Sequence, residues 1–215
     1  MYLKELWRYP VKSMAGEPLQ EVELTKLGLA GDRQILVQAS TGRILTSRTH
    51  HKLLGLKGTL DADNQPRING LLWNSKEATQ LVSDNLNQPV KLIRHEGPER
   101  FDILPLLVAT DGAINYMQID SRRLRPNLII GGVEGLEERN WPEHTLQIGA
   151  TKIAPAQLRG RCVMTTYDPD TLVQDMNVLR NIIKQLDGVM ALDTAVITPG
   201  HLRVNDSVEL DPHVR

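Results

Sequence analysis

The 215-residue chain has only one cysteine, which excludes a disulfide within the chain. A chain of this length buries enough apolar surface to fold without a covalent cross-link. The N-terminus also lacks the unbroken apolar core and the small-residue cleavage site of an export signal. Together these absences predict a soluble protein of a reducing compartment, the cytoplasm.

An excess of charge of one sign is missing as well. The 25 lysines and arginines are balanced by 26 aspartates and glutamates, so the formal net charge is −1. A partner such as nucleic acid or an anionic membrane would favour a strongly basic surface. We therefore expect neither nucleic acid nor a membrane as the partner. Internal repeats, linkers and low-complexity tracts are absent too, which leaves one large domain or two small units that share a core.

The basic residues show one local concentration. Arg122, Arg123 and Arg125 fall within four positions. If the fold gathers them they form an anion-binding cluster, and otherwise they form a solvated face. The sequence leaves both readings open, and the solvated face is the commoner outcome for such residues.

Short apolar runs divided by turn residues predict a mainly β (α+β) protein with a few helices. The runs between residues 43 and 92 are typical of a small antiparallel unit. Helical spacing of apolar residues is confined to 76–87, 110–119 and 176–186. Strands are expected at 102–108 and 128–130, the latter central in its sheet, and a hairpin is expected to turn at Gly149-Ala150.

The single thiol, Cys162, lies beside Arg161 and close to Arg159. A nearby guanidinium favours the thiolate form, which is a nucleophile and a ligand for soft metals. A lone cysteine is nevertheless more often a small buried apolar residue. The run 162–167 predicts a strand and 168–171 a turn, so the pattern places a cationic thiol at the rim of a pocket.

Six short motifs occur along the chain in the order seen in MOSC-domain proteins. They are Pro10-Val11-Lys12-Ser13; Gly31-Asp32-Arg33; Arg125-Pro126-Asn127-Leu128; Trp141 with Ile148-Gly149; Arg161-Cys162 with Thr165-Thr166 and Asp168-Pro169-Asp170-Thr171; and Pro199-Gly200. Each is short, but together they are specific. The whole chain resembles the branch of that family with an added N-terminal β region, which includes the mitochondrial amidoxime reducing component and its bacterial relatives.

The resemblance implies a fold and a division into domains. We expect a MOSC-type β-barrel with a few helices, formed by residues 1–33 and 102–215, and a small additional β domain formed by residues 34–101. The cofactor is expected in the cleft between the two, a common place for ligand sites.

The resemblance also implies a site. In that family a cysteine binds the molybdenum of a pterin-based molybdenum cofactor (Mo-molybdopterin), and basic residues hold the pterin and phosphate ends. Carried over by position, Cys162 becomes the metal ligand and catalytic residue. The implied cofactor-binding residues are Lys12, Ser13, Arg33, Arg125, Asn127 and Arg161. The chemistry agrees, because a thiolate suits a soft metal and cationic side chains suit a phosphate-bearing anion.

The chain departs from the family pattern at several positions. Ile103 and Leu104 stand where relatives often carry small hydroxyl residues, so a contact there would come from the backbone. Leu172 replaces a frequent glycine, and residues 190–193 replace a more usual aromatic-glycine pattern. The chain also lacks the cluster cysteines of the ferredoxin-like extension in some relatives. Electrons are therefore expected from a separate donor protein of ferredoxin, cytochrome b5 or flavoprotein type.

The resemblance implies an oxidoreductase that reduces small N-oxygenated compounds, such as amidoximes and N-hydroxylated bases. Two alternatives stay open from the residues alone. Cys162 could carry a persulfide in a sulfur carrier, or the chain could be a binding module without activity. A labile sulfane adduct without molybdenum would identify the carrier, and the absence of both would identify the module.

Overall fold

The computed structural model describes residues 1–211, and strands dominate it, so the mainly β class expected from the sequence is confirmed. The strands are β1 (Tyr2–Arg8), β2 (Glu17–Leu19), β3 (Glu21–Thr25), β4 (Gly28–Leu29), β5 (Ile35–Ala39), β6 (Ile44–Leu45), β7 (Gly58–Leu60), β8 (Pro66–Ile68), β9 (Leu71–Leu72), β10 (Val90–Arg94), β11 (Leu106–Thr110), β12 (Leu128–Gly131), β13 (Thr145–Ile148), β14 (Thr151–Gly160), β15 (Val189–Thr198), β16 (Gly200–Arg203) and β17 (Val208–Asp211). The α-helices are α1 (Lys76–Leu86), α2 (Asp111–Met117) and α3 (Met176–Leu186). Short 3₁₀ helices are η1 (His51–Gly55), η2 (Pro98–Arg100), η3 (Ser121–Arg123), η4 (Glu137–Asn140) and η5 (Val163–Thr166).

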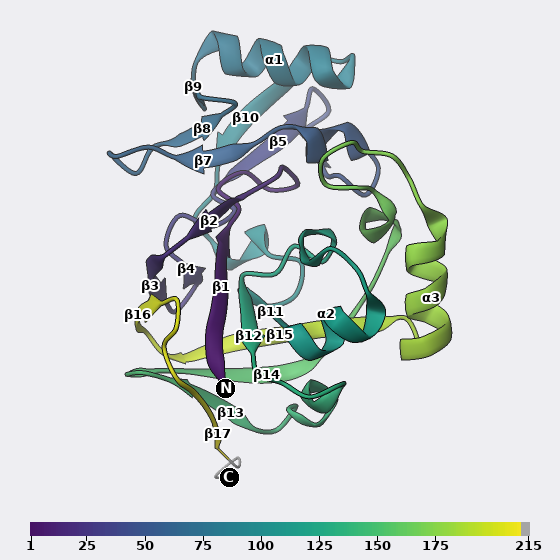
Figure 1. The fold of residues 1–215 in the computed structure, drawn as a ribbon. Helices are drawn as coiled ribbons and strands as arrows, with labels where there is room; N and C mark the ends of the chain where they lie inside the picture. The colour runs from purple at the N-terminus through teal and green to yellow at the C-terminus, as the bar shows by residue number, and fades with distance from the viewer. Residues whose placement is uncertain (212–215) are drawn as a thin grey trace.

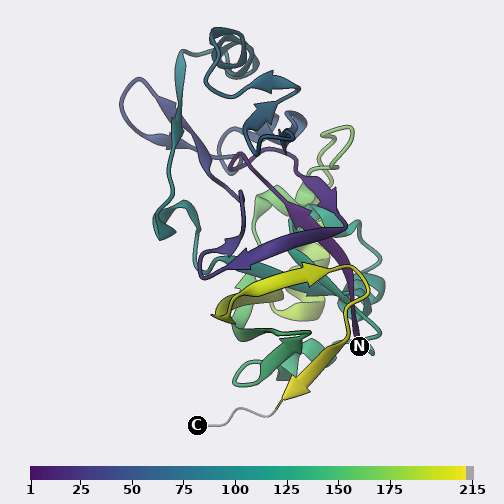
Figure 2. The same cartoon turned by 90° about the vertical axis from the view of Figure 1, so that its left-hand side faces the viewer.

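The largest sheet has eight strands in the order β17-β13-β14-β15-β11-β12-β1-β2. Neighbouring strands are antiparallel except β11 and β12, which run parallel. Tyr2 at the start of β1 also forms a bridge with Ser207, directly before β17. The sheet therefore curls until the start of β1 lies beside the residues that precede the edge strand β17, and the N-terminus lies close to that strand (Figures 1 and 2).

A smaller unit lies above the large sheet in both views (Figures 1 and 2). It consists of the sheets β10-β5-β6 and β7-β8-β9 together with α1. Its core joins Ile35, Val37, Leu53 and other apolar residues of this unit to Val11 and Met14.

The first thirty-odd residues contribute to both cores. Leu3, Leu6, Leu24 and Leu29 pack with the apolar side chains of the large sheet, whereas Val11 and Met14 pack with the smaller unit. The start of the chain therefore ties the two parts together. The domain boundaries at residues 33 and 102 stay a prediction.

Most of the elements expected from the sequence are present. The three helices occur where apolar periodicity predicted them, and each begins after a capping side chain, Ser75, Thr110 or Asp175, that accepts a backbone N–H. β12 lies inside the sheet between β11 and β1, and β13 and β14 form the expected hairpin. Within residues 1–211, no helix is long and apolar enough to cross a bilayer.

Two segments expected as strands differ. β11 begins only at Leu106, because Pro105 has no N–H to donate to a sheet. The run after Cys162 forms η5 instead of a strand. There the hydroxyls of Thr165 and Thr166 donate to the carbonyls of Cys162 (2.9 Å) and Val163 (2.7 Å), and these local bonds compete with sheet pairing.

Candidate functional site

A pocket of about 90 Å³, here called the thiol pocket, brings together all seven residues singled out by the resemblance. These are Lys12, Ser13, Arg33, Arg125, Asn127, Arg161 and Cys162. The other lining residues are Ser47, Arg48, Arg100, Phe101, Asp102, Leu104, Leu107, Leu124, Arg159, Gly160 and Met164. The pocket thus collects side chains from the start, the middle and the last third of the chain, although their roles toward a cofactor stay predictions.

Cys162 lies directly beyond the last residues of β14. The backbone N–H of Arg161 donates to the carbonyl of Gly188, just before β15 (2.8 Å), which holds the end of the strand in place. Cys162 is half-buried, unpaired with any other cysteine, and extended at φ −135°, and η5 starts after it. The thiol is therefore fixed at a corner between a sheet strand and a tight turn.

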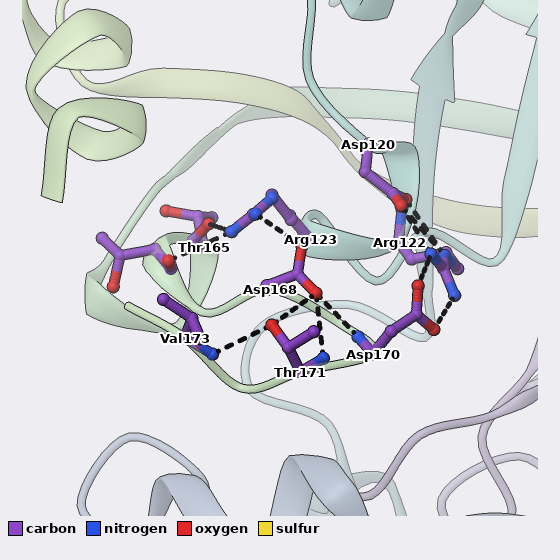
Figure 3. Close-up of polar contacts among 9 residues, drawn as sticks. Asp120, Arg122, Arg123, Thr165, Asp168, Asp170, Thr171 and Val173 are labelled. Carbon is purple, nitrogen blue, oxygen red and sulfur yellow. Dashed lines mark hydrogen bonds and ion pairs between the residues drawn. The ribbon is translucent and has the colours of Figure 1, made fainter. Parts of the chain in front are cut away.

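The loop that follows the thiol is anchored by two arginines of η3 (Figure 3). Arg122 forms ion pairs with Asp120 and Asp170, both at 2.7 Å. Arg123 donates to the carboxylate of Asp168 and to the carbonyl of Thr166, both at 3.0 Å. These ion pairs keep the loop fixed beside the pocket.

The arginine cluster of the sequence is therefore divided. Arg122 and Arg123 form ion pairs with aspartates of the loop, and of the three arginines Arg125 alone lines the thiol pocket. The structure shows neither one anion-binding cluster nor a solvated face.

The corner at Lys12 reaches the segment that precedes β11. Its ammonium donates to the carbonyl of Arg100 and to a carboxylate oxygen of Asp102, both at 2.8 Å. Burial works to raise the pKa of Asp102, but the bond from Lys12 and the nearby arginines outweigh it and hold that pKa below its usual value. Asp102 is therefore a carboxylate at neutral pH and offsets part of the positive charge.

Asp32, which the sequence motifs contained but did not single out, is fully buried and connects three neighbours. It accepts the backbone N–H of Tyr9 (2.8 Å) and the side-chain amide of Asn127 (3.2 Å), and it pairs with the guanidinium of Arg33. The side-chain oxygen of Asn127 in turn accepts from the guanidinium of Arg33 (3.1 Å) and from the backbone N–H of Leu107 (3.2 Å). The side chain of Asn127 is thus already used to hold its neighbours in position.

Tyr9 lies under two of the pocket arginines. The guanidinium carbons of Arg125 and Arg33 lie 4.4 and 5.1 Å from the centre of its ring. Burial raises the pKa of Tyr9 to about 12, so the ring stays a neutral phenol. Burial also lowers the pKa of Arg125 to about 10, which still leaves it protonated at neutral pH. The electron-rich face of the Tyr9 ring thus stabilises both guanidinium groups without neutralising their charges.

The thiol pocket carries a large excess of positive charge. Seven basic side chains line it with one carboxylate, that of Asp102, and two of the seven, Arg33 and Arg159, are paired with the buried carboxylates of Asp32 and Asp193. Among the described residues, the buried Nε atoms of Arg100, Arg159 and Arg161 have no hydrogen-bond partner. Burial lowers the pKa of Arg161 to about 10, because keeping this cation out of water disfavours its charged form.

An anion bound in the pocket would offset the repulsion among the cations that line it. Arg48 and Arg100 belong to this set but carried no signal in the sequence, because each is a single basic residue in an otherwise ordinary segment. Only the fold shows that they line the pocket. A soft thiolate and a ring of cations form a donor set that fits a phosphate-bearing, sulfur-rich metal cofactor.

Two family models match the chain. Residues 1–96 match the MOSC N-terminal beta barrel domain, and residues 105–209 match the MOSC domain. The chain belongs to the MOSC family. The resemblance inferred from the six motifs is therefore confirmed.

Relatives with known names support this assignment. The chain is 26% identical over 275 residues to "Mitochondrial amidoxime reducing component 2" of Macaca fascicularis, an alignment that covers 95% of this chain and 82% of the relative. It is also 26% identical to "Mitochondrial amidoxime-reducing component 1" of Homo sapiens, over 78% of this chain and 66% of the relative. The crystal structure of the YUAD protein from Bacillus subtilis matches 99% of this chain with a TM-score of 0.56 and 9% identity, and this likeness shows the fold alone.

Proposed function

We propose that this MOSC protein is a molybdenum-cofactor-dependent reductase of N-oxygenated compounds such as amidoximes and N-hydroxylated bases. The observation that carries the proposal is the thiol pocket, in which the only thiol of the chain lies among seven basic side chains. Relatives that align with almost the whole chain are named amidoxime reducing components, which supports this reaction class.

In this proposal Cys162 binds the metal, and the arginines and Lys12 hold the anionic parts of the cofactor. Arg125 and Arg161 are the strongest candidates for direct contacts, because the Arg125 guanidinium makes no hydrogen bond to any described side chain or carbonyl and the Nε of Arg161 has no partner. Arg33 presents a guanidinium oriented by Asp32 and Asn127. Ser13 and Asn127 complete the proposed set, Asn127 mainly by orienting Arg33.

The cofactor would supply two electrons to the substrate. An amidoxime takes up these electrons and two protons, its N–O bond breaks, and the products are an amidine and water. The protein positions the cofactor and excludes competing ligands, and the redox chemistry belongs to the cofactor. We further propose that the electrons come from a separate ferredoxin, cytochrome b5 or flavoprotein, and that the protein works in the cytoplasm.

The test measures cofactor and activity in the same preparations. Protein from a host that makes the molybdenum cofactor is analysed for molybdenum and, after oxidation, for pterin fluorescence. Reduction of benzamidoxime is then followed with reduced methyl viologen as the electron donor. We expect bound molybdenum, a pterin signal and benzamidine as the product.

The matched variant is Cys162→Ala, which removes only the sulfur and should cost on the order of 1 kcal/mol of stability. We expect it to fold and to lose reduction. Arg203→Ala, at an exposed arginine on β16, serves as the control and should match the wild type. Wild-type turnover in Cys162→Ala would contradict the metal-ligand role. A sulfane adduct on Cys162 without molybdenum would instead favour the persulfide carrier.

A further inference from the structure

A second and larger cavity, of about 370 Å³, adjoins the thiol pocket. Its lining residues are Trp7, Tyr9, Ala15, Gly16, Pro18, Leu54, Gly55, Lys57, Arg122, Arg123, Arg125, Met164, Tyr167, Pro169 and Asp170. We call it the Trp7 chamber. Arg125 and Met164 line both cavities, so these two side chains form the boundary between them. The chamber and the thiol pocket are therefore neighbours with a partly shared wall.

The walls of the chamber suit a planar apolar body. Trp7, Tyr9 and Tyr167 supply aromatic surface, and Leu54 and Met164 supply aliphatic surface. The ring of Tyr167 is stacked on His51, with centroids 4.7 Å apart and planes within 3°. This stacking restricts the ring of Tyr167, which lowers the entropy that this side chain loses on binding.

Most of the charge around the chamber is already neutralised. Arg122 is paired with Asp120 and Asp170, and Arg123 is bound to Asp168 and to backbone carbonyls (Figure 3). Among the described residues, neither the ammonium of Lys57 nor the guanidinium of Arg125 has a carboxylate or carbonyl partner. Because Arg125 is a proposed cofactor contact, Lys57 is the cation that remains available to a ligand in the chamber.

We propose that the Trp7 chamber binds the part of the substrate that does not react, and that it prefers planar aromatic compounds carrying an anionic group, which Lys57 attracts. The inference rests on the proposed reductase function, because the reacting N–O group would point past Arg125 and Met164 into the thiol pocket. A cationic body would be disfavoured by the charge of Lys57.

Binding is tested without turnover, using the holoenzyme and no electron donor. The probes are benzamidoxime, its 4-carboxyl derivative and its 4-trimethylammonium derivative, and the readout is tryptophan fluorescence. We expect each probe to quench the fluorescence of Trp7 when it binds. The carboxyl probe should bind most tightly and the trimethylammonium probe most weakly. Trp7→Phe should remove the fluorescence change, because Trp73 and Trp141 do not line the chamber.

Charge reversal provides the matched pair. Lys57→Glu changes an exposed lysine that lines the chamber, and Lys52→Glu changes an exposed lysine on η1 that lines neither cavity. Lys57→Glu should weaken the carboxyl probe by about fivefold or more and strengthen the trimethylammonium probe, as expected for one charge contact near a surface. Lys52→Glu should leave both affinities within twofold of the wild type.

Turnover supplies the second readout. In Lys57→Glu the change should appear in KM for the carboxyl substrate, while kcat stays near the wild-type value, because Lys57 does not line the thiol pocket. Equal changes in probe affinity for Lys57→Glu and Lys52→Glu, or equal affinities for the three probes, would refute the proposed role of the chamber in substrate binding. Failure of the wild type to reduce any amidoxime would instead refute the proposed function and leave the fluorescence result as a separate test of binding.

Discussion

Replacing Asp32 with alanine removes an acceptor that three residues around the thiol pocket share. Tyr9, Arg33 and Asn127 each donate to this carboxylate, which is fully buried. Removing one partner of a buried ion pair typically costs about 3–5 kcal/mol, because the remaining charge is left without compensation. A domain is stabilised by about 5–15 kcal/mol, so the variant should remain folded at 25 °C but with a reduced margin.

The assay is urea unfolding of the cofactor-free protein, followed by molybdenum analysis of protein made in a cofactor-competent host. For a slope near 2.5 kcal/mol per molar urea, the loss corresponds to a midpoint lower by roughly 1–2 M. Molybdenum content should also fall, because Arg33 loses the group that orients it. Asp63→Ala, at an exposed aspartate, is the control and should change neither quantity. An Asp32→Ala midpoint within about 0.2 M of the wild type, with full molybdenum, would refute the reasoning, because ~0.2 M is the shift that a typical surface substitution produces at this slope.

Two further predictions concern pH and the backbone. Burial raises the pKa of Glu138, so unfolding releases its proton and stability falls as the pH rises from about 4.5 through the folded-state value. Glu138→Gln keeps an acceptor for the hydroxyl of Thr110 and cannot titrate. The urea midpoint of the variant minus that of the wild type should therefore increase as the pH rises. A difference that does not change with pH would contradict this. At Arg33, where φ is 53°, Arg33→Gly should be more stable than Arg33→Ala by about 1 kcal/mol, because only glycine adopts this backbone without strain. Equal urea midpoints for the two variants would show that the backbone there is unstrained, and both should retain less molybdenum than the wild type.

The elements that the sequence predicted correctly are those whose signals are local. α1, α2 and α3 combine a capping residue with apolar side chains at helical spacing, and both signals lie within a dozen residues. The β13–β14 hairpin depends in the same way on Gly149, whose φ of 55° permits the turn. The family could also be recognised from the sequence, because the six short motifs occur in a fixed order along the chain.

The polar partners of the site could not be predicted in this way. The difference between Arg122, Arg123 and Arg125 depends on Asp168 and Asp170, which approach from a loop more than forty residues later. The same holds for Arg48 and Arg100, which reach the thiol pocket only because two distant segments pack beside Cys162. The sequence around a basic residue does not indicate which acidic residue or ligand will bind it in the folded protein.

The backbone of the site shows why local rules fail there. Ser13, Arg33 and Arg125 all have φ between 53° and 73°, a region that costs a residue with a side chain about 1–2 kcal/mol. Long-range contacts hold the chain in place around two of them, since the N–H of Lys12 donates to Ile35 and that of Arg33 to Tyr9, both at 2.8 Å. Glycine would fit each of these positions with less strain, but it would remove the side chain that faces the pocket. Strain at three proposed cofactor contacts is thus what is expected where side-chain chemistry, and not backbone preference, decides the residue.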